Sequence, residues 1–158
     1  MIHDVLIVCS GNMCRSPLAA AELRRALLEA GVRGTRVHSA GTVASAGVAA
    51  SEPAIEVAEH EGLDISYHRS TPLSQDLIHR SDLVVVMEKE HLNEVLRLAP
   101  EAGGKSILLS EFAAGAERGK DVTDPYGASY VFYEQIFFYM KPMLARLARW
   151  LSGQEPKD

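Results

Sequence analysis

The chain has 158 residues, of which 47% are hydrophobic and 23% charged, with a formal net charge of -5. This length and composition predict one globular domain over residues 1–158 and exclude a disordered chain. The acidic balance argues against nucleic acid and anionic membranes as partners.

Apolar runs alternate with helical periodicities along the chain. Four runs predict buried strands: residues 5–8, 35–40, 83–87 and 106–109. Four stretches with apolar residues at helical spacing predict helices: residues 16–31, 51–62, 88–99 and 128–151. Strands that alternate with helices predict an α/β fold in which helices cover both faces of a parallel sheet.

The loop from Cys9 to Pro17 connects the first predicted strand to the first predicted helix. Ligands of parallel sheets bind at the carboxyl ends of the strands, near the switch in strand order, so this loop is the expected binding site. Its backbone N–H groups can form a nest for a phosphate dianion, helped by the helix amino end. Gly11 and Asn12 tolerate left-handed backbone angles, and Arg15 offers a planar fork for two phosphate oxygens.

Cys9 ends the first strand at the centre of this positive field. A helix amino end and nearby cations stabilise a thiolate, so we expect Cys9 to be ionised and to attack phosphorus in line. Ser16 can donate its hydroxyl group to the sulfur, and together with Pro17 it also predicts the helix N-cap. A cysteine at the end of a strand can equally be a small buried hydrophobic residue, but the spacing of Cys9, Arg15 and Ser16 favours catalysis.

Two segments resemble the low-molecular-weight protein tyrosine phosphatases. Cys9 to Pro17 is similar to the signature loop of that family, and Asp124-Pro125-Tyr126-Gly127 is similar to its general-acid loop. Because these segments lie at opposite ends of the chain and the strand–helix order between them is similar, the resemblance covers nearly the whole chain. It implies a doubly wound fold with a four-stranded parallel sheet and helices on both faces, and neither a metal nor an organic cofactor.

The resemblance also implies an activity, that of a protein-tyrosine-phosphatase that hydrolyses phosphate monoesters through a phosphocysteine intermediate at Cys9. The leaving oxygen needs a proton, and Asp124 is the expected general acid, which then activates water as a general base. Pro125 stiffens the loop behind Asp124. The expected partner is a phosphotyrosine-containing protein or a small aryl phosphate.

The expected site residues have distinct roles. The catalytic residues are Cys9, Arg15 and Asp124. The phosphate-binding residues are Ser10, Gly11, Asn12, Met13, Cys14, Arg15 and Ser16. The supporting residues are Asn12, Ser16, Ser39 and His68, of which Ser39 and His68 are implied by the resemblance alone. Met13 and Tyr126 are expected to flank the substrate pocket, and no residue is expected to bind a metal.

Cys14 has two interpretations. It can be an inert filler of the loop. It can also form a reversible disulfide with Cys9 that protects the thiolate from over-oxidation, and the resemblance supports this protective role.

Relatives often carry an aromatic residue on the loop after the second strand, but residues 42–47 contain none. We therefore expect one wall of the pocket to be open, which weakens the case for phosphotyrosine. Protein-arginine phosphatases resemble the same family and are the alternative. In them the position of Met13 resembles a small threonine, so the bulky Met13 favours the tyrosine-type pocket.

Other classes of protein fit the sequence less well. Arsenate reductases of similar build need further cysteines to pass electrons, and this chain has none after Cys14. A non-catalytic phosphate-binding module would need neither Cys9 nor Asp124. A zinc site is not expected, because both cysteines lie in one tight loop and the histidines show no paired ligand spacing.

Aromatic residues nearly surround the first half of the last predicted helix: Tyr130, Phe132, Tyr133, Phe137, Phe138 and Tyr139. A helix that is apolar all round is usually buried, so we expect it to pack against the sheet, with a kink at Pro142. A self-association surface is the alternative, and the chain is expected to be a monomer or a weak homodimer. The sequence shows no apolar stretch that could span a bilayer and no cationic leader, and we expect a cytoplasmic protein.

Overall fold

A parallel sheet of four strands forms the centre of the structure, a computed structural model that describes residues 1–154. The strands are β1 (Asp4–Cys9), β2 (Arg36–Gly41), β3 (Leu83–Val86) and β4 (Ser106–Leu108). They lie in the order β2-β1-β3-β4, so the chain leaves β1 toward one side and later returns to pair β3 on its other side. The carboxyl end of β1 is therefore the switch point of a doubly wound fold, and the predicted fold class is confirmed.

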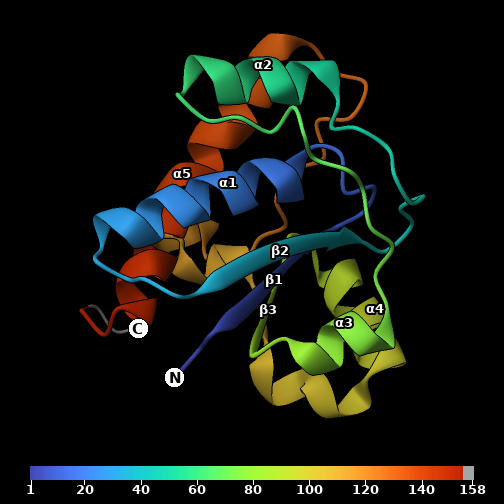
Figure 1. The fold of residues 1–158 in the computed structure, drawn as a ribbon, viewed down its shortest axis with the longest axis vertical. Coiled ribbons are helices and arrows are strands. Elements are labelled where there is room, and N and C mark those ends of the chain that lie inside the picture. Colours follow the sequence, from blue (N-terminus) through green and yellow to red (C-terminus); the bar gives the residue numbers. More distant parts are fainter. Residues whose placement is uncertain (155–158) are drawn as a thin grey trace.

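Helices cover both faces of this sheet, as Figure 1 shows. On one side lie α1 (Arg15–Glu29), α2 (Glu52–His60) and α5 (Tyr130–Leu151). On the opposite side lie α3 (Gln75–Arg80) and α4 (Lys89–Leu98). Short 3-10 helices span Pro100–Lys105, Leu109–Phe112 and Gly115–Glu117. Within residues 1–154, no helix is long and apolar enough to cross a membrane.

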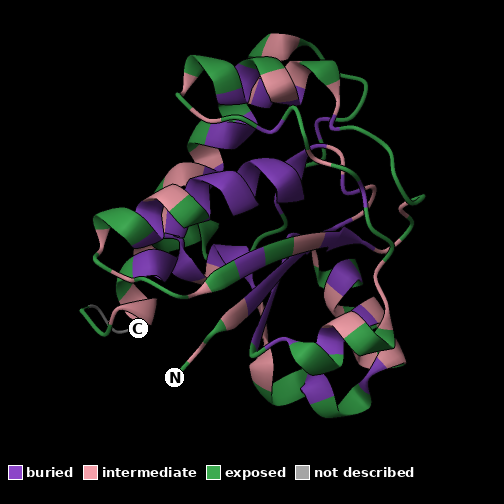
Figure 2. Ribbon diagram, in the orientation of Figure 1, coloured by how far each residue is buried: buried purple, intermediate pink, exposed green. Residues whose placement is uncertain are grey.

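Alternating strand residues build two separate cores. Val5 and Ile7 of β1 belong to the core with α1, α2 and α5, whereas Leu6 and Val8 belong to the core with α3 and α4. Because both faces of the sheet are covered, its inner strands β1 and β3 are nearly continuous apolar runs instead of alternating ones. In Figure 2 the buried colour accordingly runs along the inner strands and along much of α1.

The predicted strands and helices are all present, within a few residues of their expected bounds. The periodicity does not predict α3, because this helix of six residues has a single buried side chain, Ile78. The predicted N-cap at Ser16 is wrong. Cys14 is the N-cap and α1 begins at Arg15, so Ser16 lies inside the first turn and its hydroxyl group contacts the loop instead.

Helix α5 packs mainly on α1, on the 3-10 helix Leu109–Phe112 and on α2. Tyr133 and Phe137 on its inner side are buried, whereas Phe138 is exposed. The helix is continuous through Pro142. The expected burial therefore applies to one side of this aromatic helix.

Candidate active site

The loop from Ser10 to Cys14 leaves the switch point and leads into α1. Gly41, the last residue of β2, lies beneath it, and a Cβ atom there would be 2.4 Å from the Ser10 carbonyl oxygen. The loop can approach β2 this closely only because residue 41 has no side chain. Among residues 1–154, Asn12 is the only non-glycine residue with a positive φ, 56°. Gly11, the other residue expected to be left-handed, is not.

The backbone amides of this loop have no protein acceptor. Within residues 1–154, no N–H group of residues 10 to 15 donates to another protein group. The first amides of a helix also lack partners inside that helix. A set of such donors at a helix amino end binds an anion that carries several oxygens.

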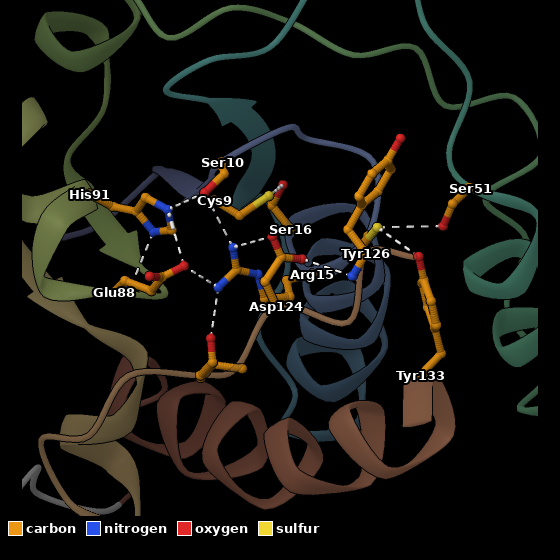
Figure 3. A network of polar contacts seen from close by, with 12 residues as sticks. Cys9, Ser10, Arg15, Ser16, Ser51, Glu88, His91, Asp124, Tyr126 and Tyr133 are labelled. Carbon is orange, nitrogen blue, oxygen red and sulfur yellow. Dashed lines mark hydrogen bonds and ion pairs between the residues drawn. The ribbon is translucent and has the colours of Figure 1, made fainter. Parts of the chain in front are cut away.

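Cys9 is buried at the base of the loop, with its Sγ atom 2.9 Å from Ser16 Oγ. Ser16 Oγ also accepts a hydrogen bond of 2.7 Å from Asn12 Nδ2. The Ser16 hydroxyl hydrogen is therefore free to be donated to the sulfur. Figure 3 shows the Cys9 and Ser16 side chains beside each other. A hydrogen bond donated to a sulfur stabilises negative charge on it.

Asn12 connects the loop to two other segments. Its Nδ2 donates to Ser39 Oγ (2.9 Å) and its Oδ1 accepts from the Thr71 N–H (2.8 Å). His68 Nε2 lies 2.7 Å from the Asn12 carbonyl oxygen and donates to it. Burial lowers the pKa of His68, which favours the neutral ring at neutral pH. The structure thus brings together Asn12, Ser16, Ser39 and His68 beneath the loop.

Arg15 is 1% exposed and held at both terminal nitrogens. One terminal nitrogen donates to Glu88 Oε2 (2.6 Å) and to the Val122 carbonyl oxygen (2.7 Å). The other donates to Ser10 Oγ (3.3 Å) and lies 3.6 Å from Asp124 Oδ2. Arg15 Nε is buried and has no protein partner. Since an unpaired buried donor is costly, this edge of the guanidinium is suited to a ligand oxygen.

Cys14 lies on the far side of the loop, toward α5. Its sulfur is 3.2 Å from the Tyr133 hydroxyl group and 3.5 Å from Ser51 Oγ. Both cysteines are free thiols. Burial raises the pKa of Cys14, and it raises that of Tyr133 to about 12, so both groups are neutral. In this state Cys14 is a protonated, packed side chain.

A pocket of about 230 Å³ lies over the loop. The residues that line it are Cys9, Ser10, Gly11, Met13, Cys14, Arg15, Val43, Asp124 and Tyr126. The structure therefore places all the predicted catalytic residues and both predicted wall residues around one pocket. Val43, which is 78% exposed, stands on the wall that the sequence predicts to be open, so this wall carries a small apolar side chain.

The segment that carries Val43 is tied to the loop by its backbone. The Thr42 N–H donates to the Cys9 carbonyl oxygen (2.9 Å), and the Val43 N–H donates to that of Ser10 (3.0 Å). The pairing of β1 with β2 thus continues beyond the two strands. Val43 is held beside the pocket although its side chain is hardly packed.

Asp124 and Tyr126 line the pocket from the segment before α5 (Figure 3). The Asp124 side chain is 44% exposed, and its Oδ1 accepts a hydrogen bond of 3.0 Å from the Tyr126 N–H. Tyr126 is 69% exposed. A carboxyl group in this position can exchange protons both with a ligand in the pocket and with water.

Sequence reasoning missed several residues around the site: Ser51, Glu88, His91, Val122 and Tyr133. Each contacts a loop residue that is 37 to 119 positions away in the chain. One local signal exists, because Glu88 and His91 form a capping box at the start of α4. Within residues 1–154, no three His, Cys, Asp or Glu side chains are placed to hold a metal ion.

The fold and the loop define a small doubly wound α/β protein with an anion-binding loop at its switch point. The family model described as "Low molecular weight phosphotyrosine protein phosphatase" matches residues 4–157. The chain belongs to this family, whose members are phosphoric monoester hydrolases, and the resemblance noted in the sequence is confirmed.

Relatives of two substrate types match the chain. It is 31% identical over 150 residues to the low molecular weight protein-tyrosine-phosphatase Etp of Escherichia coli K12, covering 95% of each chain. It is 33% identical over 155 residues to a protein-arginine-phosphatase of Geobacillus stearothermophilus, covering 98% of this chain and 100% of that one. The crystal structure of the tyrosine phosphatase Wzb from Escherichia coli K30 in complex with sulphate gives a TM-score of 0.85 at 36% identity, covering 96% and 99% of the two chains.

Proposed function

We propose that the chain is a protein-tyrosine-phosphatase in which Cys9 is the nucleophile, Arg15 binds the phosphoryl group and Asp124 transfers protons. One observation carries the proposal: the Cys9 sulfur, the guanidinium with its unpaired Nε and the Asp124 carboxyl group all border the same pocket.

The first step forms the phosphocysteine. The Cys9 thiolate attacks phosphorus, the bond from phosphorus to the phenolic oxygen breaks, and protonated Asp124 gives its proton to that oxygen. Arg15 Nε and the loop amides stabilise the equatorial phosphoryl oxygens, where charge is concentrated.

The second step hydrolyses the phosphocysteine. Asp124, now a carboxylate, takes a proton from water as the water oxygen attacks phosphorus. The phosphorus–sulfur bond breaks, inorganic phosphate forms, and the Ser16 hydroxyl group stabilises the departing thiolate. The partial exposure of Asp124 gives it access to that water.

The walls of the pocket favour an aromatic substrate. Met13 and Tyr126 line the entrance and can contact a phenyl ring on its faces. Phosphoarginine is the second candidate for two reasons. Val43 is a small side chain, so one wall of the pocket is short. In addition, a protein-arginine-phosphatase is 33% identical to this chain. The proposed substrate is a phosphotyrosine-containing protein, and an aryl phosphate should serve in its place. The monomeric or weakly dimeric state and the cytoplasmic location stay predictions.

We also propose that Cys14 protects Cys9. Peroxide converts the Cys9 thiolate to a sulfenic acid, and the Cys14 thiol attacks that sulfur, which forms the disulfide and releases water. Mass spectrometry after peroxide treatment should find this disulfide. Over-oxidised Cys9 in its place would contradict the protective role.

The covalent mechanism is tested with Cys9→Ser. We expect turnover of 4-nitrophenyl phosphate to be lost while inorganic phosphate still binds, because the amides and Arg15 remain. Vanadate should inhibit the unmodified protein competitively, since it mimics five-coordinate phosphorus. Near-normal hydrolysis by the serine variant would end the proposal.

The substrate is tested by a direct comparison. Two peptides of the same sequence, one with phosphotyrosine and one with phosphoarginine, are hydrolysed side by side. We expect a higher kcat/KM for the phosphotyrosine peptide. A preference for the phosphoarginine peptide would replace this proposal by the second candidate.

A further inference from the structure

The free edge of Arg15 is aimed by two side chains, Glu88 at one terminal nitrogen and Ser10 at the other. Both of these residues contact the same third residue, His91 of α4. His91 is 3% exposed, it does not line the pocket, and the mechanism above gives it no part. A buried titratable group that touches both anchors of the phosphate-binding guanidinium calls for an explanation.

The contacts of His91 determine where its proton sits. Its Nδ1 accepts the Glu88 N–H at 3.1 Å, so Nδ1 is unprotonated. The ring proton is then on Nε2, which donates to Ser10 Oγ at 2.8 Å (Figure 3). Ser10 Oγ also accepts from Arg15 at 3.3 Å. With both lone pairs in use, the Ser10 hydroxyl hydrogen remains available for a further acceptor, and Ser10 lines the pocket.

We propose that neutral His91 is a positioning residue that fixes Ser10 as a side-chain donor to the bound phosphoryl group and keeps Arg15 aligned beside it. This inference rests on the proposed function, because it places a phosphoryl group in the loop. His91 touches no reacting atom and acts through Ser10 and Glu88.

Protonation of His91 undoes this arrangement. A proton on Nδ1 opposes the Glu88 N–H, and the imidazolium attracts the Glu88 carboxylate, 3.6 Å from Nε2, away from Arg15. The charged groups around the ring come from several segments. Burial and Arg15 of α1 lower the pKa of His91, whereas Glu88, Asp121 and Asp124 raise it. Burial is the largest of these effects, so the neutral ring prevails near neutral pH and is lost on acidification.

Two substitutions separate the contacts of the ring. His91→Asn places a carbonyl oxygen near the position of Nδ1 and is too short to reach Ser10. His91→Gln reaches the position of Nε2, can donate to Ser10, and has the amide that commonly closes a capping box. Neither variant titrates in this range.

The measurement is inhibition of 4-nitrophenyl phosphate hydrolysis by sulfate, which stays a dianion from pH 5 to 8. At pH 7.5 we expect His91→Asn to raise the sulfate inhibition constant about fivefold, the cost of one lost hydrogen bond. His91→Gln should recover most of that loss. Below pH 6.5, the sulfate affinity of the unmodified protein should fall more steeply than that of His91→Gln.

Two controls test whether the effect passes through Ser10. Ser10→Ala should weaken sulfate inhibition, and adding His91→Asn to it should cost little more, because the two residues act on one hydrogen bond. His79→Asn, which removes an exposed histidine paired with Glu101, should leave the constant unchanged.

The outcomes separate this inference from the proposed function. An unmodified protein that sulfate does not inhibit would refute the anion-binding loop itself. Three results would overturn the role of His91 alone, provided that sulfate inhibits the unmodified protein. Sulfate affinity could fall equally in His91→Asn and His91→Gln, or it could fall in neither. The third result is a loss of affinity in His91→Asn that adds in full to the loss in Ser10→Ala.

Discussion

The two ends of the pocket are built in different ways. At the phosphate end, Arg15 is buried and is contacted by Glu88, the N-cap of α4, by the loop and by the segment before α5. At the substrate end, Val43 and Tyr126 are exposed, and within residues 1–154 no hydrogen bond holds the Tyr126 hydroxyl group. We infer that changes at the buried end lower activity on every substrate, whereas changes at the exposed end alter the choice between substrates.

The largest effect should come from Arg15→Lys at the buried end. An ammonium group cannot reproduce the planar fork that contacts Glu88, Ser10 and a ligand together. We expect kcat/KM for 4-nitrophenyl phosphate to fall about 1,000-fold, and for phosphotyrosine and phosphoarginine peptides alike. Arg24→Lys on the same helix is the matched control. A fall in kcat/KM for only one of these substrates would contradict the inference that the buried end serves every substrate.

Asp124→Asn tests a group that lies between the two ends. Because the amide cannot donate the proton that a poor leaving group needs, hydrolysis of phenyl phosphate should slow about 100-fold. Substrates with good leaving groups, such as 4-nitrophenyl phosphate, should slow less. Asp121→Asn, in the same segment, serves as control in the same kinetic assay. Equal slowing for all leaving groups would exclude Asp124 as the general acid.

Val43→Trp tests the exposed end. A ring at this position can pack against a substrate ring, so the ratio of kcat/KM for phosphotyrosine over phosphoarginine peptides should rise about fivefold. Val48→Trp, an exposed valine that does not line the pocket, is the control. If Val43→Trp lowered both activities equally, the substrate end would be as constrained as the phosphate end.

The smallest expected effect is on the pH dependence of the free energy of unfolding, and it arises from two histidines at the phosphate end. The folded-state pKa of His68 and His91 lies below the ordinary value of 6.5, mainly because of burial. The unfolded chain therefore binds more protons as the pH falls below 6.5, and the free energy of unfolding decreases. Each such group contributes a slope of at most about 1.4 kcal/mol per pH unit.

Urea unfolding between pH 7.5 and 5 measures this slope. His91→Gln should flatten it, because the variant has no ring to protonate. An unchanged slope in His91→Gln would mean that His91 titrates alike in the folded and unfolded chain.

The sequence predicts the parts of the molecule that depend on neighbouring residues. The runs at residues 5–8 and 83–87 identify the inner strands because both faces of those strands are buried. The loop from Cys9 to Ser16 is recognisable because its chemistry is contiguous in the chain. Ser16 misleads as a cap, since the loop uses its hydroxyl group for the sulfur.

The parts that escape prediction depend on tertiary contacts. Glu88 lies 73 positions from Arg15, and Tyr133 lies 119 positions from Cys14. No spacing in the sequence indicates that a glutamate starting a helix will bind an arginine of another helix. The resemblance to a known family supplied Ser39 and His68, which the residues alone do not indicate.

The backbone bonds that Thr42 and Val43 make to the loop have an evolutionary consequence. They fix the backbone of residue 43 beside the pocket, whereas the side chain at this position is free to vary. A single substitution at position 43 could therefore change the substrate of an enzyme in this lineage without changing its catalytic residues. We therefore expect enzymes that act on different phosphorylated amino acids to differ first at such positions, and only later in their phosphate-binding loops.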